Sequence, residues 1–389
     1  MKLPGARSGT VVVIARYWHH LALLALAALC TLAYGSHRGQ SWHYFVEGSR
    51  ALFCAAGSGS GSCGLHIYAA HPELQIGPLS FVAARLVTLW GDEGATAAEL
   101  AMTLLGLGAL LVLEHDTRRS VGPAARKRLQ RRVFLAGVVF VPAWVDLSVR
   151  FAHLDDVLAL TFTALAVRAV VRGGSTSVGV LLALATLSKP WAIAFLPLAW
   201  AVPAGRRLRT TAWAVVPVVL TAALFVAADP ATLTAARFGI PNSPASSLRV
   251  LGVTAVTTPS WDRPAQFALG LVLGGVAVLR GRWAAAVMVA AAARIALDPG
   301  VYSYYTAAIL LGAVIWDVHA RIGRDFPAWS WLVFGALFLC RYLPLGDRVL
   351  GALRLGVCLA VVGAALLVSR PLGAAFLRAP PIGDPAQVR

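Results

Sequence analysis

The 389-residue sequence is poor in charge, because only 13% of its residues are Asp, Glu, Lys or Arg while 58% are hydrophobic. A soluble core cannot enclose that much apolar surface, so the composition excludes an ordinary water-soluble domain. Acidic residues are the scarcest, with 17 Asp and Glu against 34 Lys and Arg. The basic runs lie between apolar stretches, which is typical of cytoplasmic loops that contact anionic lipid head groups. We therefore expect membrane lipids as partners, and no nucleic acid.

Cysteine is scarce as well, with five residues in the chain. Cys54 and Cys63 flank a run of Ala, Gly and Ser in a segment that we place outside the membrane. An oxidising outer compartment permits a disulfide between them. A zinc site would need a second pair at ligand spacing, which these two cysteines lack. We expect no cofactor, and a divalent metal is compatible with the acidic residues but not expected.

The apolar stretches and the placement of Lys and Arg predict an all-α, polytopic integral membrane protein with about twelve crossings. Both termini are expected in the cytoplasm, and the membrane to be the bacterial plasma (inner) membrane. Residues 1–378 then form one transmembrane domain with outer loops 36–96 and 229–264, and 379–389 form a disordered cytoplasmic tail. The predicted spans are 17–35, 97–113, 133–149, 157–172, 178–188, 191–204, 211–228, 266–280, 283–297, 303–320, 329–343 and 349–369.

Two of these spans, 178–188 and 191–204, are too short to cross alone. We expect the chain to reach outward and return there, with Ser188-Lys189-Pro190 at the apex, because proline lacks a backbone donor. Irregular backbone at that depth needs a protein or water lining, which predicts a cavity beside Lys189. The stretch 74–90 is expected to lie on or dip into the outer leaflet, since a crossing there would push the basic loop 114–132 outside.

The segment directly after the first span mixes aromatic and ionisable residues. Trp42 and Tyr44 offer faces for a sugar ring, and Glu47 is the leading candidate for a general base that accepts a proton from an attacking hydroxyl. The alternative is an interfacial aromatic belt, with Glu47 merely paired to Arg50 at helical spacing.

A second outer segment, bracketed by prolines, carries His71, Glu73 and Gln75. These side chains either contact sugar hydroxyls or cap the start of the helix that follows.

A third polar segment, His153-Leu154-Asp155-Asp156, separates two predicted spans. Adjacent carboxylates between apolar helices are costly without a cation partner or a role. Asp155 and Asp156 are therefore candidates for acid-base chemistry or for holding a metal on a pyrophosphate donor, although a strict D-x-D spacing is absent. Capping of the following helix by Asp155 is the structural alternative.

The last polar segment contains Arg294, Asp298, Tyr304 and Tyr305. An arginine near the outer boundary can hold a lipid phosphate, and tyrosines offer hydroxyls and ring faces to a sugar or a prenyl chain. Lys189 is a further outer cation that can serve. The alternative is that the arginine snorkels to the interface and the tyrosines form an aromatic belt.

Taken in order, these segments resemble the GT-C class of membrane glycosyltransferases, especially the bacterial polyprenyl-phosphate-mannose-dependent, alpha-mannosyltransferase-like branch. The similarity covers roughly residues 17–320 and consists of a long outer loop with an acid, then His71-Pro72-Glu73, then His153-Leu154-Asp155-Asp156, and a helix that breaks at Lys189-Pro190. The resemblance implies a GT-C-like fold and inverting transfer of a sugar, mannose, from a polyprenyl-phosphate donor to a lipid or glycan acceptor of the cell envelope. It also implies an outer-loop carboxylate as base and no metal.

One departure from that family concerns the base. The family's acid commonly lies nearer the end of the first span, where this chain has Gln40, Ser41 and Trp42. Glu73 or Asp155 is therefore an alternative to Glu47. Two other classes of protein stay open: a lipid or solute transporter, which predicts inverted repeats that the sequence does not display, and a non-catalytic membrane partner, which would account for the missing early acid.

Overall fold

The computed structural model of the protein describes residues 6–54, 62–89, 91, 94–119, 121–235, 239–320 and 325–367. The predicted tail 379–389 lies outside the described residues. In the described part of the chain the secondary structure is helical, which confirms the all-α prediction, and the one extended pairing is an isolated bridge between Pro241 and Thr257.

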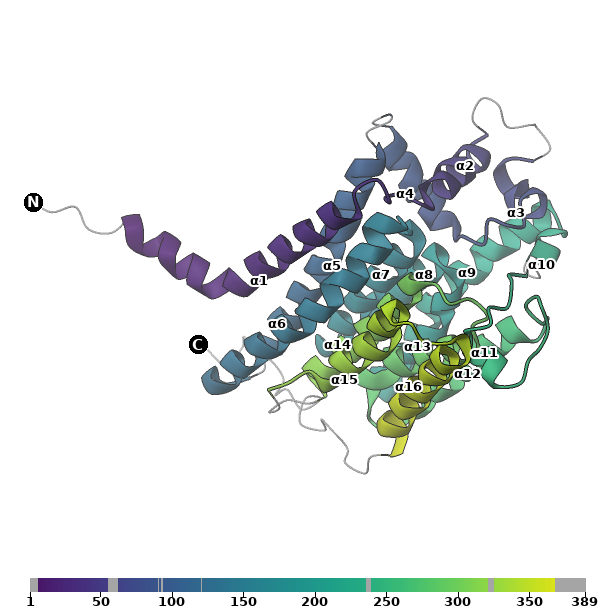
Figure 1. The fold of residues 1–389 in the computed structure, drawn as a ribbon. Helices are drawn as coiled ribbons and strands as arrows, with labels where there is room; N and C mark the ends of the chain where they lie inside the picture. Colours follow the sequence, from purple (N-terminus) through teal and green to yellow (C-terminus); the bar gives the residue numbers. More distant parts are fainter. Residues whose placement is uncertain are drawn as a thin grey trace, which may run out of the picture.

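The α-helices form a single bundle, from which the N-terminal part of the first helix projects (Figure 1). They are α1 (Ala6–Tyr34), α2 (Trp42–Leu52), α3 (Ile67–Ala70), α4 (Pro78–Thr88), α5 (Gly94–Arg119), α6 (Pro123–Val145), α7 (Leu154–Val171), α8 (Ser175–Ser188), α9 (Arg207–Ala228), α10 (Thr232–Ala235), α11 (Ser247–Val250), α12 (Asp262–Leu279), α13 (Ala286–Leu297), α14 (Thr306–His319), α15 (Ala328–Val333) and α16 (Asp347–Leu367). Short 3₁₀ segments are η1 (Gly64–His66), η4 (Pro190–Ala201), η5 (Ala204–Arg206), η6 (Trp283–Ala285), η7 (Ser303–Tyr305) and η9 (Leu339–Tyr342), and η3 (Asp146–Arg150) and η8 (Phe334–Phe338) are π-helical.

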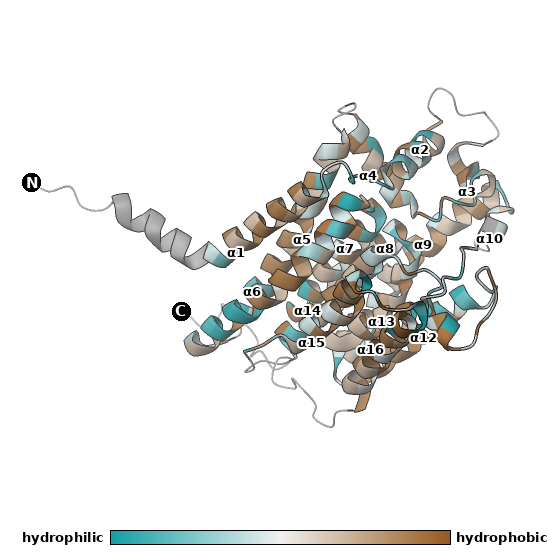
Figure 2. Cartoon of the chain, viewed as in Figure 1, coloured by the Kyte–Doolittle hydropathy of each residue, from teal (hydrophilic) through white to brown (hydrophobic). Residues whose placement is uncertain are grey.

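Five helical segments of the described chain are long and apolar enough to cross a membrane. They are Gly94–Arg119, Pro123–Arg150, Ala204–Ala228, Asp262–Leu279 and Asp347–Leu367. Shorter apolar helices surround them, and Figure 2 shows hydrophobic residues along most of the bundle, with hydrophilic residues at helix ends such as the start of α6. The helices therefore indicate a membrane protein, and the remaining predicted crossings stay predictions.

Close helix packing depends on small residues in this bundle. A Cβ on Gly106 of α5 would lie 2.2 Å from the indole nitrogen of Trp144 in α6, and that nitrogen donates a hydrogen bond to the Met102 carbonyl at 2.9 Å. Glycine at such a position lets two backbones approach, which is the usual way helices associate in lipid. The innermost helix is α14, whose residues from Thr306 to Val318 are all buried.

The chain breaks at the predicted apex. Helix α8 ends at Ser188, Lys189 is extended, and η4 begins at Pro190. Helix α4 lies over this break: the Gly77 N–H and the Ser80 hydroxyl both donate to the Ser188 carbonyl at 3.0 Å. A Cβ on Gly77 would lie 2.0 Å from the Leu187 carbonyl oxygen, so glycine is required for this approach. The predicted outer helix is thus a shorter element, α4, that docks on the helix break.

One other sequence prediction, the disulfide, is confirmed by the structure. Cys54 and Cys63 form a disulfide that closes the segment after α2. Asp146 and Arg150 form an ion pair at 3.3 Å, and the Tyr34 hydroxyl also donates to Asp146 at 3.0 Å. These contacts tie α1 to η3, the short π-helix that leads into the polar segment before α7.

Polar side chains gather at two ends of the bundle, and the first and last turns of α7 mark these two ends. Asp155 and Asp156 lie in the first turn of α7, whereas Arg168 and Arg172 lie in its last turn and its C-cap. A helix rises about 1.5 Å per residue, so the two groups are roughly 20 Å apart. We call the end that holds Asp155 and Asp156 the site end, and the end that holds Arg168 and Arg172 the arginine end.

Candidate functional site

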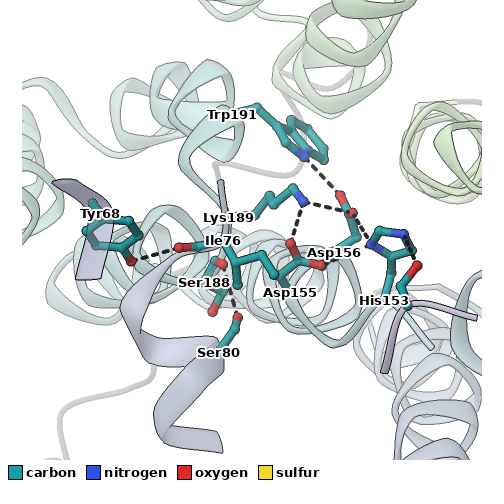
Figure 3. Close-up of polar contacts among 10 residues, drawn as sticks. Tyr68, Ile76, Ser80, His153, Asp155, Asp156, Ser188, Lys189 and Trp191 are labelled. Carbon is teal, nitrogen blue, oxygen red and sulfur yellow. Dashed lines mark hydrogen bonds and ion pairs between the residues drawn. The ribbon is translucent and has the colours of Figure 1, made fainter. Parts of the chain in front are cut away.

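The site end contains a buried ionic network (Figure 3). Asp155 and Asp156 are 0% and 3% exposed. Lys189, at the break between α8 and η4, forms an ion pair with Asp155, and its Nζ lies 3.5 Å from Oδ2 of Asp156. The adjacent acids therefore have the cation partner that their burial requires. The lysine side chain is 16% exposed and points toward these acids, and the cavity predicted beside it stays a prediction.

His153 connects the network to the segment after the first helix. Its Nδ1 lies 3.4 Å from Oδ1 of Asp155 and 3.6 Å from Oδ2 of Asp156. Its Nε2 lies 3.1 Å from the Ser41 hydroxyl. The Ser41 backbone is held in turn, since its N–H donates to the Phe151 carbonyl at 2.9 Å. The imidazole thus stands between a hydroxyl and two carboxylates.

Aromatic rings surround the acids. The Tyr304 ring stacks on the His153 ring, with 4.0 Å between centroids and 25° between planes. The Trp191 indole N–H donates to Oδ1 of Asp156 at 2.9 Å. The guanidinium of Arg294 lies over two rings, 4.3 Å from the centroid of Trp191 and 4.4 Å from that of Tyr305. Such a cation is held by ring faces and retains donors for an anion.

Asp298, which directly follows α13, is also buried. Its carboxylate lies 3.5 Å from Nε of Arg294 and accepts the Gly300 N–H at 2.8 Å. Burial raises the pKa of Asp298 above its usual range, and the charge of Arg294 opposes that rise. Arg354 of α16 donates to the Gly300 carbonyl at 3.3 Å. Three cations of the site end, Lys189, Arg294 and Arg354, therefore lie near its buried acids.

Sequence reasoning missed Ser41, Trp191 and Arg354 as members of the site. Arg354 had a usable signal, because an arginine within the apolar run 349–369 marks a functional position by default. Its Nε has no hydrogen-bond partner among the described residues. Ser41 and Trp191 had no such signal, since only the fold brings them to His153 and Asp156.

One carboxylate oxygen of the network is incompletely satisfied. Oδ2 of Asp156 accepts no hydrogen bond from the described residues, and Nζ of Lys189 and Nδ1 of His153 lie 3.5 and 3.6 Å from it. A buried oxygen in that state is costly, and such atoms mark a place where a ligand or a proton can be received. The network can therefore accept a proton or a hydrogen-bond donor at this oxygen.

The same residues bear on metal binding. Ligand atoms of His153, Asp155 and Asp156 lie within 4.8 Å of one another. The Lys189 ammonium already contacts both carboxylates, so a divalent ion would have to displace a charge that the chain supplies. The expectation that the site uses no metal stays a prediction.

The remaining predicted site residues are not drawn into the network. Glu47 and Tyr44 lie on the exposed side of α2, and the Glu47 carboxylate has no ion pair or hydrogen bond among the described residues, Arg50 included. His71 and Glu73 contact each other at 3.3 Å on an exposed turn that also holds Gln75. Trp42 is buried beside Phe45. Their roles in chemistry or binding stay predictions.

Comparisons of the chain with protein-family models, with curated proteins and with solved structures found no match. A functional conclusion therefore depends on the residues and geometry of the site.

Proposed function

We propose that the protein is a GT-C-like membrane glycosyltransferase, with twelve crossings and the site end on the outer face of the plasma membrane. It would transfer a sugar, mannose, from a polyprenyl-phosphate donor to a lipid or glycan acceptor of the cell envelope, with inversion at the anomeric carbon. The observation that carries this proposal is the buried network of His153, Asp155, Asp156 and Lys189. Ionisable groups at such depth are rare unless they serve a substrate.

We assign the general base to His153. Its Nε2 faces the Ser41 hydroxyl at 3.1 Å, the distance at which an acceptor hydroxyl would approach it. The acceptor oxygen loses its proton to Nε2 and attacks the anomeric carbon, while the carbon–oxygen bond to phosphate breaks and polyprenyl phosphate leaves with the electron pair. Asp155 and Asp156 would stabilise the imidazolium through Nδ1–H.

This assignment explains why no acid directly follows the first span. Ser41, in the position where the family resemblance places a carboxylate, contacts His153, so the histidine and its acids occupy the same region of the site. Glu47 is the competing base, and its test is given in the Discussion.

The cations of the site end would receive the donor phosphate. Arg294 keeps a flat guanidinium between Trp191 and Tyr305, and a guanidinium binds phosphate oxygens through paired N–H donors. The ring of Tyr304, stacked on His153, offers a face for the sugar. The choice of mannose depends on the family resemblance alone.

The direct test is transfer by purified protein given labelled polyprenyl-phosphate mannose and membrane lipids. We expect a labelled product, and a loss of about 10²–10⁴-fold in rate for His153→Gln. The matched control is His43→Gln, because His43 is an exposed histidine of α2. Absence of any product, with the donor intact, would contradict the proposal and favour a transporter or a non-catalytic partner. Equal activity of the two variants would remove the base assignment.

A second candidate activity follows from one observation. Ser41, His153 and Asp155 stand in the order hydroxyl, imidazole, carboxylate, with separations of 3.1 and 3.4 Å, as in serine acyl-transfer enzymes. Ser41→Ala separates the two activities. An acyl transferase would lose activity and its labelling by a fluorophosphonate, whereas a glycosyltransferase that uses His153 would retain most of its transfer.

A further inference from the structure

Two histidines and a glutamate converge away from the site end. His19 and His20 lie on α1, and Glu114 lies near the end of α5. Both imidazole Nε2 atoms are 2.9 Å from the same oxygen, Oε2 of Glu114. His19 and Glu114 are buried, and His20 is partly exposed. Neither the sequence predictions nor the proposed function uses these residues.

We infer that His19, His20 and Glu114 form a binding site for a divalent metal ion of the zinc class. The donor set is two imidazole nitrogens and one carboxylate oxygen, a combination that suits zinc and its neighbours. The three donor atoms lie within 4.8 Å of one another. Tetrahedral zinc, with bonds of about 2.0–2.1 Å to these ligands, needs ligand atoms roughly 3.3 Å apart. The two nitrogen–oxygen separations of 2.9 Å need to widen by only a few tenths of an ångström, and the separation between the two imidazole nitrogens lies within 4.8 Å.

A second layer of contacts supports the ligands. The Gln130 side-chain amide lies 2.8 Å from Nδ1 of His19. Amide oxygen and nitrogen exchange places by a half-turn, and with the oxygen facing Nδ1 the amide accepts the Nδ1 proton. That tautomer leaves the lone pair of Nε2 for a metal, which is how outer partners orient histidine ligands.

Two features of the surroundings affect metal binding: a nearby cation weakens it, and the partial exposure of one ligand admits water. Arg118 lies 3.9 Å from the other Glu114 oxygen, Oε1, so a cation already faces the far side of the carboxylate. This charge lowers metal affinity without occupying Oε2. The partial exposure of His20, whose side chain is 18% accessible, leaves room for water as a fourth ligand.

The metal would fasten α1 to its neighbours. Helix α1 contacts the bundle through α5 and α6, and its N-terminal part extends away from the other helices (Figure 1). Ligands from α1 and α5, with Gln130 of α6 behind them, would fix the point where the helix leaves the bundle. The inference is independent of the glycosyltransferase proposal.

The experiment uses the full-length protein, purified through a tag without histidine and stripped with a chelator. Bound metal per chain is measured after equilibration with Zn²⁺, and the absorption spectrum after equilibration with Co²⁺. We expect one Zn²⁺ per chain, a tetrahedral Co²⁺ spectrum and a higher melting temperature with Zn²⁺. All three should be lost in Glu114→Gln, which keeps a hydrogen-bond acceptor for both histidines but removes the anionic ligand.

The control is His153→Gln, because His153, Asp155 and Asp156 form the other cluster of possible ligands in the described chain. Metal binding should persist in this variant. No stoichiometric metal in the wild type, or binding that survives Glu114→Gln, overturns the inference. Loss of binding in His153→Gln alone also overturns it and moves the metal to the site end. Should Glu114→Gln fail to fold, His20→Gln provides the same test at the partly exposed ligand.

Discussion

The two ends of the bundle hold buried carboxylates in different ways. At the arginine end, Asp116 is shared by two arginines: Arg172 donates to Oδ1 at 2.7 and 3.1 Å, and Nε of Arg168 lies 3.2 Å from Oδ2. At the site end, Asp155 and Asp156 share one lysine and one histidine, at separations that reach 3.6 Å. Arginine presents a rigid planar fork of donors to a carboxylate, whereas lysine is a point charge on a flexible stem. The first arrangement fixes helices, and the second can rearrange around a ligand.

Other contacts at the arginine end support this distinction. Both the N–H and the hydroxyl of Ser330 donate to Oδ2 of Asp317 at 2.9 Å, so the acid caps the start of α15. Arg132 donates to the Asp317 carbonyl at 2.9 Å. These contacts satisfy free backbone groups at helix ends, which is a structural role. Burial alone therefore does not identify a reactive acid.

The largest expected effect is on thiol labelling from outside the cell, which tests which end of the bundle faces outward. If the site end is outside, a cysteine at position 126 should not react with a membrane-impermeant thiol reagent in intact cells, whereas a cysteine at the partly exposed position 71 should be labelled. Arg126→Cys and His71→Cys are compared in a chain whose free cysteines Cys30, Cys340 and Cys358 are replaced by serine. Labelling of position 126 from outside would reverse the topology and place the site end in the cytoplasm.

The next effect separates a reactive acid from a structural one. Asp156→Asn keeps the size of the side chain and its acceptor for Trp191, but it cannot stabilise an imidazolium, so transfer should fall by about 10²–10⁴-fold. Asp116→Asn at the arginine end should leave transfer per folded molecule near normal. The measurement is the initial rate with labelled donor, corrected for folded protein. Equal losses in both variants would mean that the two ends do not differ in function.

Removing one cation from each end should change the free energy of unfolding by different amounts. Lys189→Ala leaves two buried carboxylates without their cation, which should cost about 3–5 kcal/mol of unfolding free energy. Arg172→Ala at the arginine end should cost roughly 0–1 kcal/mol, since that side chain is 42% exposed and Arg168 still holds Asp116. Denaturant unfolding in detergent compares them. An unchanged stability of the Lys189→Ala protein would show that the two carboxylates do not depend on this cation.

The disulfide gives a smaller effect, confined to one region. Cys54 and Cys63 close a short loop next to α2, and replacing both by serine should lower stability by about 2–3 kcal/mol. The arginine end is held by ion pairs and should not respond to a reductant. Hydrogen exchange with and without reductant should show faster exchange in α2 and η1 and unchanged exchange around Asp116. Uniform loosening of both ends would show that they unfold together.

The smallest expected effect belongs to Glu47. Because its carboxylate is exposed and without a described partner, Glu47→Gln should leave both folding and transfer near normal if His153 is the base. The sequence alone predicts a fall of about 10²–10⁴-fold for the same change. A well-folded Glu47→Gln protein without transfer would return the base to the outer loop, and His153→Gln would then be expected to transfer normally.

Much of the fold follows from local pattern. Apolar periodicity predicts the helices, proline predicts the break after Lys189, and a pair of outer cysteines predicts the disulfide. The exposed face of α2 was not predicted: Trp42, Phe45 and Ser49 are buried, which leaves Glu47, the leading candidate base, outside.

The composition of the site could be predicted only in part. His153, Asp155, Asp156, Lys189 and the segment from Arg294 to Tyr305 were expected at the outer end, yet which of them meet depends on helix packing. Arg354 reaches the Gly300 carbonyl across 54 residues of sequence, and Ser41 reaches His153 across 112. Contacts of that range are set by the register of whole helices against one another, which no local pattern encodes.

The docking of α4 on the break after α8 has a consequence for biogenesis. The Ser188 carbonyl receives both of its donors, Gly77 and Ser80, from a segment made more than a hundred residues earlier. During synthesis α4 must therefore wait while four longer helices emerge, and the break stays unsatisfied in the membrane until it meets that segment.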